Sequence, residues 1–292
     1  MTVGAVVVRW RGGDEVRRCL GSLVERGGTS LVRVVLVDSG SGDNGADRLG
    51  REFPTIEVEA LAENRSFAWA AGRGAARCRE PYLLLLNPDC EVPAGSLDAM
   101  LEFLEDRPDV AGAAPLLTSD DGQPQHGWQL RHLPGVARLA SGRGGAPMFP
   151  YGPPAEPAPV EQPAAAAWLV RRTVWDALEG LDPEFAPAWW EDVDFCARLK
   201  QRRAGSEGVS EGFWIVPDAH IVHLGGSSLQ HLSDADFLSA FYGNLLRYAR
   251  RHHPEALVLV RAGLRLSLLT RALLRPARRQ AFLQTFKSLA SS

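Results

Sequence analysis

The stretch YLLLLNPDCEV, residues 82–92, decides the fold class, because an apolar run passes directly into carboxylates and a proline. Residues 82–86 are a tyrosine and four leucines, which is typical of a strand buried on both faces. Asp89 and Glu91 follow at the strand's end. An Asn-Pro-Asp turn would explain these residues, and so would hard oxygen ligands for Mg²⁺ or Mn²⁺.

Similar apolar runs recur before this stretch and alternate with segments of helical periodicity. Buried strands are predicted over 3–8, 32–38, 56–61 and 82–87, and helices over 14–27, 67–78 and 95–108. This alternation indicates an α/β domain with a mostly parallel central sheet flanked by helices. Ligands of such sheets bind at the carboxyl ends of the strands, where the sequence places Arg9, Trp10, Asp38, Asp89 and Glu91.

The second half of the chain begins with a Pro- and Gly-rich stretch over 140–165, which predicts an irregular connection. A strand and then a helix are predicted over 164–178, and another helix begins near Glu191. One or two strands end at His223, and helices follow over 234–254 and 256–289, with an interruption at Pro276.

Several residues of this half could carry chemistry, although each also has a structural explanation. Glu191 and Asp192 could favour the dipole of a helix start, and His223 could be a core histidine. Beside Asp89, His223 could instead be a metal ligand. Trp189 and Trp190 could pack in the core or offer flat faces to a sugar.

Composition narrows the classes of protein. A net charge of −3 gives no sign of general nucleic-acid binding. The four cysteines form no CxxC pair, so we expect reduced thiols in a cytoplasmic protein. No run of 18 apolar residues occurs, so no membrane span is predicted. Phosphate-binding glycine loops are missing after the first strand, which favours a metal as the means of holding a phosphorylated ligand.

Six motifs in order resemble family 2 glycosyltransferases of the GT-A fold, especially their bacterial rhamnosyltransferase-like branch. The resemblance covers the chain from about Val3 to about Pro254. Its motifs are VVVRWRGGDEVRRCLGSL (6–23), VVLVDSGSGD (34–43), ENRSFAWAAGRG (63–74), LLLLNPDCEV (83–92), GLDPEFAPAWWEDVDFCARL (180–199) and VPDAHIVHLGGSS (216–228).

The resemblance implies a GT-A catalytic domain over 1–230 and a C-terminal helical extension over 231–292. Within the catalytic domain it implies a nucleotide-binding half over 1–115 and an acceptor and catalytic half over 116–230. The implied activity is inverting transfer of a sugar, rhamnose first, from a dTDP- or UDP-sugar to a hydroxyl acceptor such as a glycan, glycolipid or natural product.

The resemblance also implies roles for individual residues. Asp89 would bind a divalent metal, Mg²⁺ or Mn²⁺, that bridges the donor's diphosphate, and His223 would complete or support that site. Asp192 would be the general base, with Glu191 beside it, and Trp189 and Trp190 would lie at the acceptor site. The nucleotide-sugar would contact Arg9, Trp10, Asp38, Asn64, Arg73, Asn87 and Asp89. Several family residues are replaced in this pocket: Arg9 and Arg11 stand for asparagines, Ser39 for Asn, Ser66 for Gly and Gly72 for Asn.

The C-terminal segment is basic, since no acidic residue follows Glu255. Over 257–275, four arginines fall within an arc of about 120° on an ideal helix, and four leucines fall opposite: Arg261, Arg265, Arg271, Arg275 and Leu259, Leu266, Leu269, Leu273. This helix could dock on an anionic membrane at the inner face of the cell membrane. Packing on the catalytic domain, or contact with a second copy in a homodimer, would also explain it.

Two other functional classes remain open beside the glycosyltransferase. A sugar nucleotidyltransferase also uses an α/β sheet and a metal, but the expected Gly-rich signature is missing after the first strand. A non-catalytic nucleotide- or sugar-binding member of the family is the other class, because the donor pocket carries the replacements above. Loss of transfer with retained nucleotide binding in Asp192→Asn would separate the enzyme from the binding protein.

Overall fold

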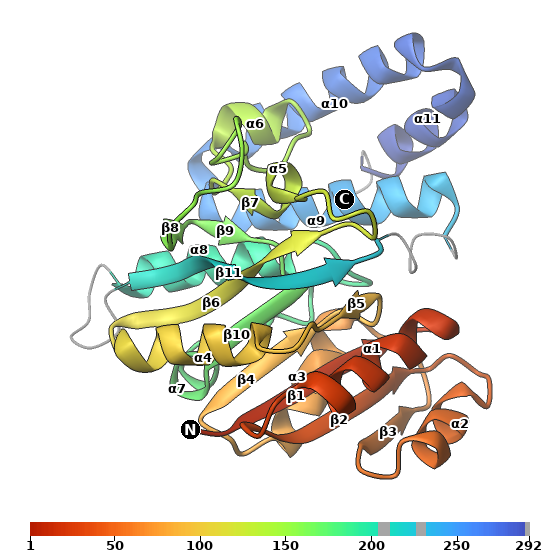
Figure 1. Cartoon of the computed structure of the whole chain (residues 1–292). Helices are drawn as coiled ribbons and strands as arrows, with labels where there is room; N and C mark the ends of the chain where they lie inside the picture. The colour runs from red at the N-terminus through yellow and green to blue at the C-terminus, as the bar shows by residue number, and fades with distance from the viewer. Residues whose placement is uncertain (204–210, 226–231, 290–292) are drawn as a thin grey trace.

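The computed structural model describes residues 1–203, 211–225 and 232–289. In these residues, nine strands form one sheet, with the order β3-β2-β1-β4-β10-β6-β11-β5 and with β8 paired to β11 (Figure 1). Their bounds are β1 Val3–Arg9, β2 Leu31–Ser39, β3 Glu57–Leu61, β4 Tyr82–Leu86, β5 Cys90–Glu91, β6 Val110–Thr118, β8 Ala158–Val160, β10 Ala167–Arg171 and β11 Glu211–His223. A separate pair joins β7 Leu130–Arg131 to β9 Gln162–Pro163.

The sheet is mostly parallel, as the apolar strands predicted. β1 runs parallel to β2 and β4, β2 to β3, and β6 to β11. β10 lies antiparallel between β4 and β6, and β5 adds antiparallel to β11. One sheet therefore joins the first 115 residues to those that follow. The expected irregular stretch 140–165 contributes the short strands β8 and β9 and one isolated bridge, between Pro147 and Arg131.

Helices cover both faces of the sheet, which explains why its strands are apolar throughout. One core packs side chains of α1, Asp14–Arg26, and α4, Ser96–Asp106, against one face. The opposite core holds side chains of α3, Phe67–Arg77, α7, Arg172–Ala177, and α8, Glu191–Arg203. The four cysteines are buried and unpaired.

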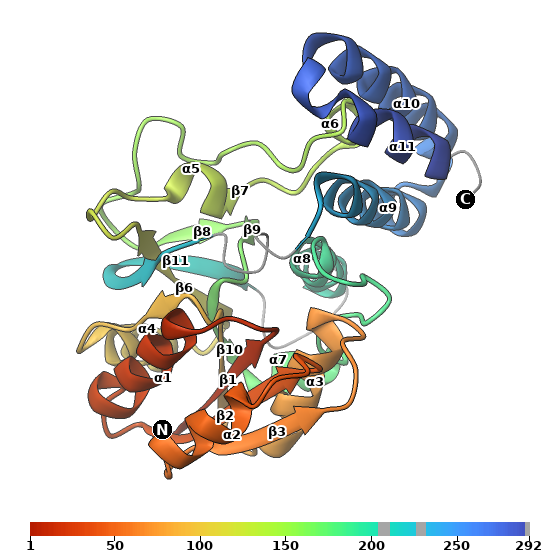
Figure 2. The same cartoon turned by 90° about the vertical axis from the view of Figure 1, so that its right-hand side faces the viewer.

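The remaining helices include a group at one end of the molecule (Figures 1 and 2). Ser233 begins α9 by accepting a hydrogen bond from the Asp236 N–H at 3.1 Å. Pro276 separates α10 from α11, as the sequence predicted. The bounds are α2 Gly45–Glu52, α5 His126–Gln129, α6 Val136–Ala140, α9 Asp234–His252, the 3₁₀ turn Pro254–Ala256, α10 Leu257–Leu274, the 3₁₀ turn Pro276–Arg278 and α11 Arg279–Ser288.

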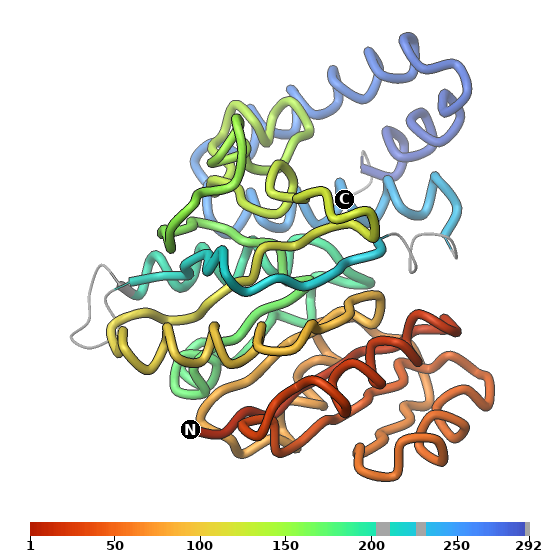
Figure 3. The backbone as a smooth tube through the Cα atoms, viewed as in Figure 1, coloured from red at the N-terminus to blue at the C-terminus, as the bar shows by residue number. Residues whose placement is uncertain are grey.

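A third core joins these C-terminal helices to the sheet domain. It contains Leu264 of α10, Tyr242 of α9, Leu139 of α6 and, from the start of α8, Trp190 and Val193. Figure 3 follows the backbone from β1 in the lower part of the view to these helices in the upper part. No helix among the described residues is both long enough and apolar enough to cross a membrane.

Candidate active site

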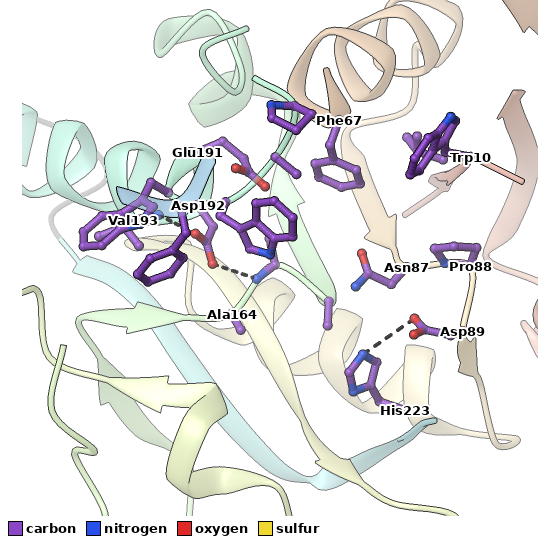
Figure 4. A pocket seen from close by; sticks show the side chains of 18 of the residues that line it. Trp10, Phe67, Asn87, Pro88, Asp89, Ala164, Glu191, Asp192, Val193 and His223 are labelled. Atoms are coloured by element: carbon purple, nitrogen blue, oxygen red, sulfur yellow. Dashed lines mark hydrogen bonds and ion pairs between the residues drawn. The ribbon is translucent and has the colours of Figure 1, made fainter. Parts of the chain in front are cut away.

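A pocket of about 560 Å³ opens at the carboxyl ends of β1 and β4 and is bounded on the other side by the start of α8 (Figure 4). This is the edge of the sheet at which the sequence placed a ligand. The candidate residues that line it are Trp10, Asn64, Asn87, Asp89, Trp189, Trp190, Glu191, Asp192 and His223.

Asp89 and His223 face each other on one side of this pocket (Figure 4). The Oδ1 atom of Asp89 lies 3.6 Å from Nε2 of His223, and both side chains are largely buried. Pairing of His223 with Cys90 between β11 and β5 brings these residues together. Burial lowers the pKa of His223, while the Asp89 carboxylate opposes that shift. A neutral imidazole beside a carboxylate has the donor set of a divalent cation site.

Gln125 fixes the orientation of His223, a contact that the sequence did not reveal. Its Oε1 lies 2.9 Å from Nδ1 of His223, and its Nε2 donates to the His223 carbonyl at 2.8 Å. An oxygen acceptor at Nδ1 selects the tautomer with hydrogen on Nδ1, which leaves the lone pair of Nε2 directed toward Asp89. Trp128 packs on the same ring with centroids 5.2 Å apart.

Cys90 completes a cluster in which ligand atoms of Asp89, Cys90 and His223 all lie within 4.8 Å of one another. Its thiol, however, donates to the Ala166 carbonyl at 3.4 Å, and burial raises its pKa well above the usual value. A protonated thiol is a weak ligand. The oxygen of Asp89 and the nitrogen of His223 therefore fit a metal better than the sulfur does.

Glu91, the second acidic residue of the opening stretch, does not join this cluster. Its carboxylate lies 3.2 Å from Nε of Arg18 and 3.9 Å from Nη2 of Arg26, on the side of α1. Side chains alternate between the faces of a strand, so Cys90 and Glu91 point opposite ways. The expectation that Glu91 shares the ligand site is wrong.

Glu191 and Asp192 lie across the pocket from Asp89, at the first turn of α8 (Figure 4). Burial, and then the neighbouring Asp192 carboxylate, raise the pKa of Glu191 well above its usual value. Oε2 of Glu191 is buried and has no hydrogen-bond partner in the described residues. Burial without a hydrogen-bond partner favours the neutral, protonated form of this carboxyl.

Asp192 has the opposite environment, because N–H donors surround its carboxylate. Oδ2 accepts from Nε2 of Gln162 at 3.0 Å and from the Ala165 N–H at 3.4 Å, and Nη2 of Arg131 lies 3.9 Å away. These contacts bring two hydrogen-bond donors and a guanidinium to the Asp192 side chain. Paired carboxyls in contrasting environments are a common arrangement for proton transfer. Gln162 and Arg131 carry no sequence motif that would have singled them out.

Trp189 and Trp190 form the loop that leads into α8, and both have positive φ, of 72° and 78°. This left-handed backbone is strained for a bulky residue and persists only where surrounding contacts hold it. Asn244 of α9 holds it by donating from Nδ2 to the carbonyls of Ala186, Ala188 and Trp189 at 3.0–3.2 Å. Trp190 is buried in the third core yet reaches the pocket, and Trp189 is partly exposed there.

Three candidate residues do not line the pocket. Arg9 is buried, and its guanidinium pairs with the carboxylates of Asp38 and Asp43. The other oxygen of Asp38 accepts from the Ser41 N–H at 2.8 Å, so both of its oxygens are engaged within the protein. Arg73 lies on the exposed side of α3 and donates to Glu59 at 2.8 Å. The part of the last sequence motif that falls within 226–231 lies outside the described residues.

Comparison with known proteins decides the family. Residues 5–151, half of the chain, match the model of glycosyl transferase family 2. The chain belongs to glycosyl transferase family 2. The glycosyltransferase is also 26% identical over 246 residues to N-acetylglucosaminyl-diphospho-decaprenol L-rhamnosyltransferase of Mycobacterium tuberculosis, an alignment that covers 75% of this chain and 74% of the relative.

Solved structures confirm the GT-A fold of the glycosyltransferase. GalNAc-T7 with UDP, GalNAc and Mn²⁺ superposes with a TM-score of 0.65 and 15% identity, over 85% of this chain and 47% of that one. The mannosyltransferase PcManGT of Pyrobaculum calidifontis, in complex with GDP-Man and Mn²⁺, gives a TM-score of 0.55 and 14% identity, over 99% of this chain and 75% of that one. The predicted family and fold class are thus confirmed.

Proposed function

We propose that this glycosyltransferase moves a sugar from a nucleoside diphosphate to a hydroxyl acceptor with inversion, using a divalent metal. One observation carries the proposal: the pair Asp89 and His223 faces the pair Glu191 and Asp192 across a single pocket. A metal at the first pair would stabilise a departing diphosphate, and the second pair would accept a proton on the opposite side of a substrate bound between them.

Asp89 and His223 would hold Mg²⁺ or Mn²⁺, since a carboxyl oxygen and an oriented imidazole nitrogen face each other there. A bound metal would supply positive charge where negative charge develops on the leaving diphosphate. Trp10, Asn64 and Asn87 line the same side of the pocket and would contact the nucleotide and sugar. The likeness to the mycobacterial relative favours rhamnose as the sugar. We propose a dTDP- or UDP-linked donor on the family resemblance of the sequence motifs.

Asp192 would take the proton from the acceptor hydroxyl, because its surroundings stabilise the carboxylate, whereas those of Glu191 stabilise the acid. Attack from that side, with the diphosphate leaving from the other, gives one displacement and inversion. Trp189 would offer its face to the acceptor. The relative's name identifies a sugar on a lipid diphosphate as its acceptor, and we propose an acceptor of that class here, reached at the inner face of a membrane.

A non-catalytic, ligand-binding role is the second candidate, and Arg9 is the observation that favours it. Arg9 pairs with Asp38, whose carboxylate was expected to contact the nucleotide-sugar. A pocket changed in this way could bind a ligand without reacting. The family assignment favours glycosyl transfer over the nucleotidyltransferase alternative.

The test screens nucleotide-sugars by thermal shift with and without Mn²⁺, followed by transfer assays with the hits. A ligand that binds only the native state must raise the melting temperature. We expect one donor to give a shift that requires Mn²⁺ and is lost in Asp89→Ala, and Asp192→Asn to keep that shift while losing transfer. If the wild type binds a donor but does not turn it over, the non-catalytic, ligand-binding role would be supported instead.

A further inference from the structure

Helix α10 carries an apolar face that the rest of the described chain does not cover. We call it the α10 leucine face, and its members are Val258, Leu259, Leu266, Leu269, Leu273 and Leu274. Val258, Leu266 and Leu273 are 82%, 67% and 74% exposed. Six of the eleven large hydrophobic side chains exposed in the described residues belong to this one helix. Single exposed leucines are ordinary, but a contiguous set marks an interaction surface.

The opposite side of α10 is the one that packs on the protein. Val260, Leu264, Leu268 and Ala272 recur every four residues and are buried in the third core, toward α6 and α9. On the same side, Arg271 donates to the Ser141 carbonyl at 3.1 Å. Figures 1 and 2 both place α10 at the periphery of the molecule. The leucine face therefore stays exposed when the opposite side of α10 packs on the protein.

The charges beside this face are mainly positive, with Glu255 just before the helix as an exposed acidic residue. Arg265, Arg275 and Arg279 are exposed on and just after α10, and no acidic residue follows Glu255 in the whole sequence. Arg265 lies at the edge of the helix, with its guanidinium 5.0 Å from the Phe286 ring. A leucine stripe bordered by arginines matches the boundary between acyl chains and anionic headgroups. A second copy of this chain would instead bring like charges together, with no acidic side chain from this segment to neutralise them.

The packed face of α10 is also continuous with the proposed acceptor side of the active site. Leu264 shares its core with Trp190 and Val193, and these two residues flank the Glu191 and Asp192 pair. Close-packed cores keep such elements in fixed relation. A lipid surface held by α10 would thus lie at a set position relative to the candidate general base.

We propose that the α10 leucine face docks the enzyme on a lipid membrane containing anionic headgroups. The inference deepens the proposed function, on which its biological meaning rests, because it identifies the surface that brings a lipid-linked acceptor to the pocket. Docking itself is a property of the surface and needs no donor, metal or catalysis.

The test measures binding of the full chain to phosphatidylcholine vesicles with and without phosphatidylglycerol, by flotation, without nucleotide or metal. We expect binding to vesicles with phosphatidylglycerol that weakens as salt increases. The double variant Leu266→Ser/Leu273→Ser should bind at least about tenfold more weakly, because two apolar side chains leave the acyl region. Neutralising arginines with Arg265→Gln/Arg275→Gln should weaken binding by roughly fivefold per residue.

The matched control is Val24→Ser/Val32→Ser, which removes two exposed apolar side chains from outside α10 and should leave vesicle binding unchanged. Each variant must keep the wild-type melting temperature within about two degrees, which shows that the fold is intact. Equal binding by the wild type and the leucine variant would overturn the proposal. So would no vesicle binding together with a dimer, seen by light scattering, that dissociates in the leucine variant.

Failure of docking can be told apart from failure of the transferase proposal. If docking is right, the leucine variant keeps wild-type transfer to a short, water-soluble acceptor and loses it only with an acceptor embedded in vesicles. If the wild type binds vesicles but turns over no nucleotide-sugar with any acceptor, the docking surface stands and the proposed reaction falls.

Discussion

Oε1 of Gln125 lies 2.9 Å from Nδ1 of His223, and Nε2 of the same side chain donates to the His223 carbonyl. This two-point contact fixes both the tautomer and the tilt of the imidazole. Asp89 approaches the other nitrogen. Gln125 therefore acts on the proposed metal only through His223, as an outer-shell residue.

Replacing Gln125 tests this relationship. We expect Gln125→Leu to weaken Mn²⁺ binding by about 10–100-fold, because the imidazole loses the acceptor that directs Nε2 toward the cation. Titration calorimetry with Mn²⁺ and no nucleotide measures this directly. The exposed neighbour Gln123 provides the control, since Gln123→Leu should bind Mn²⁺ like the wild type. Equal Mn²⁺ affinity in Gln125→Leu and the wild type would refute an orienting role.

The two carboxyls of α8 should respond differently to amide substitution. The raised pKa of Glu191 favours its neutral, protonated form. Glu191→Gln copies that charge and should change turnover by less than about tenfold. Asp192→Asn removes the proposed base and should lower turnover by about 10²–10⁴-fold. Steady-state rates at saturating donor give both values. A larger loss in Glu191→Gln than in Asp192→Asn would reverse the assigned roles.

Glu191 also gives the unfolding free energy a pH dependence. Its pKa is raised in the fold, so above the usual value of 4.5 the native state keeps a proton that the unfolded chain releases. Stability from this group therefore falls as pH rises from about 4.5 toward the raised value. We expect Glu191→Gln to melt at a higher temperature than the wild type at pH 8, and the gap to close near pH 4. A gap independent of pH would show that the residue does not titrate in this way.

The Asp194 carboxylate links α8 to α9. Replacing it should lower the free energy of unfolding more than replacing an exposed aspartate does. Its buried carboxylate contacts Nε of Arg198 at 2.7 Å, Nε2 of His252 at 2.8 Å and Nη1 of Arg251 at 3.0 Å. Asp194→Asn removes the carboxylate from this buried network, although Arg251 keeps its ion pair with Asp182. We expect a loss of about 3–5 kcal/mol in denaturant unfolding. Asp234→Asn breaks an exposed pair with Arg278 and should cost less than about 1 kcal/mol.

The same link should weaken in acid. Burial opposes ionisation of Asp194, but the His252 hydrogen bond and Arg198 outweigh it and hold the pKa of the carboxyl below its usual 3.8. Its contribution is complete above about pH 3.8 and is lost as pH falls through the lower folded value. The stability difference between wild type and Asp194→Asn should therefore shrink below pH 3.8. A difference that stays constant down to pH 2 would contradict the prediction.

Asn244 should position the loop of Trp189 and Trp190 through its amide N–H groups. Asn244→Asp keeps the shape and the bond from Arg247 but loses the donors to three carbonyls. We expect it to lower stability by about 1–3 kcal/mol and to raise the acceptor KM more than the donor KM. Asn244→Gln, which retains the donors on a longer side chain, should recover part of the effect. Equal changes in both KM values would point to a general structural role.

Much of the fold could be predicted, because short sequence patterns identify the individual strands and helix ends. The apolar runs that became β1, β2 and β4 admit few other structures, and Gly27 and Pro276 mark helix ends. The antiparallel insertion of β10 between β4 and β6 was not predictable, because an apolar run carries no direction. The two-residue strand β5 is too short to leave a pattern.

Site residues that belong to sequence motifs were predicted. Those that act through a single contact with a distant part of the chain were missed. Asp89, Glu191, Asp192 and His223 come from recognisable motifs, and the structure brings them to one pocket. Gln125 and Asn244 were missed, since a glutamine in a turn and an asparagine in a helix have no local signature. Arg9 was noted as a replacement, but its pairing with Asp38 depends on the register between β1 and β2, in which the two residues lie side by side. Its pairing with Asp43 depends on the path of the chain after β2.

The pairing of β5 with β11 has a consequence for how the protein is made. Asp89 emerges early during synthesis, whereas β11, which carries His223, is the last strand in the described residues. A nascent or truncated chain that ends before residue 211 contains the aspartate without the histidine. With Asp89 and His223 as the proposed ligands, the cation site would be complete only after β11 has joined the sheet. Metal content per chain would therefore report how much of a preparation has completed its sheet, before any reaction is measured.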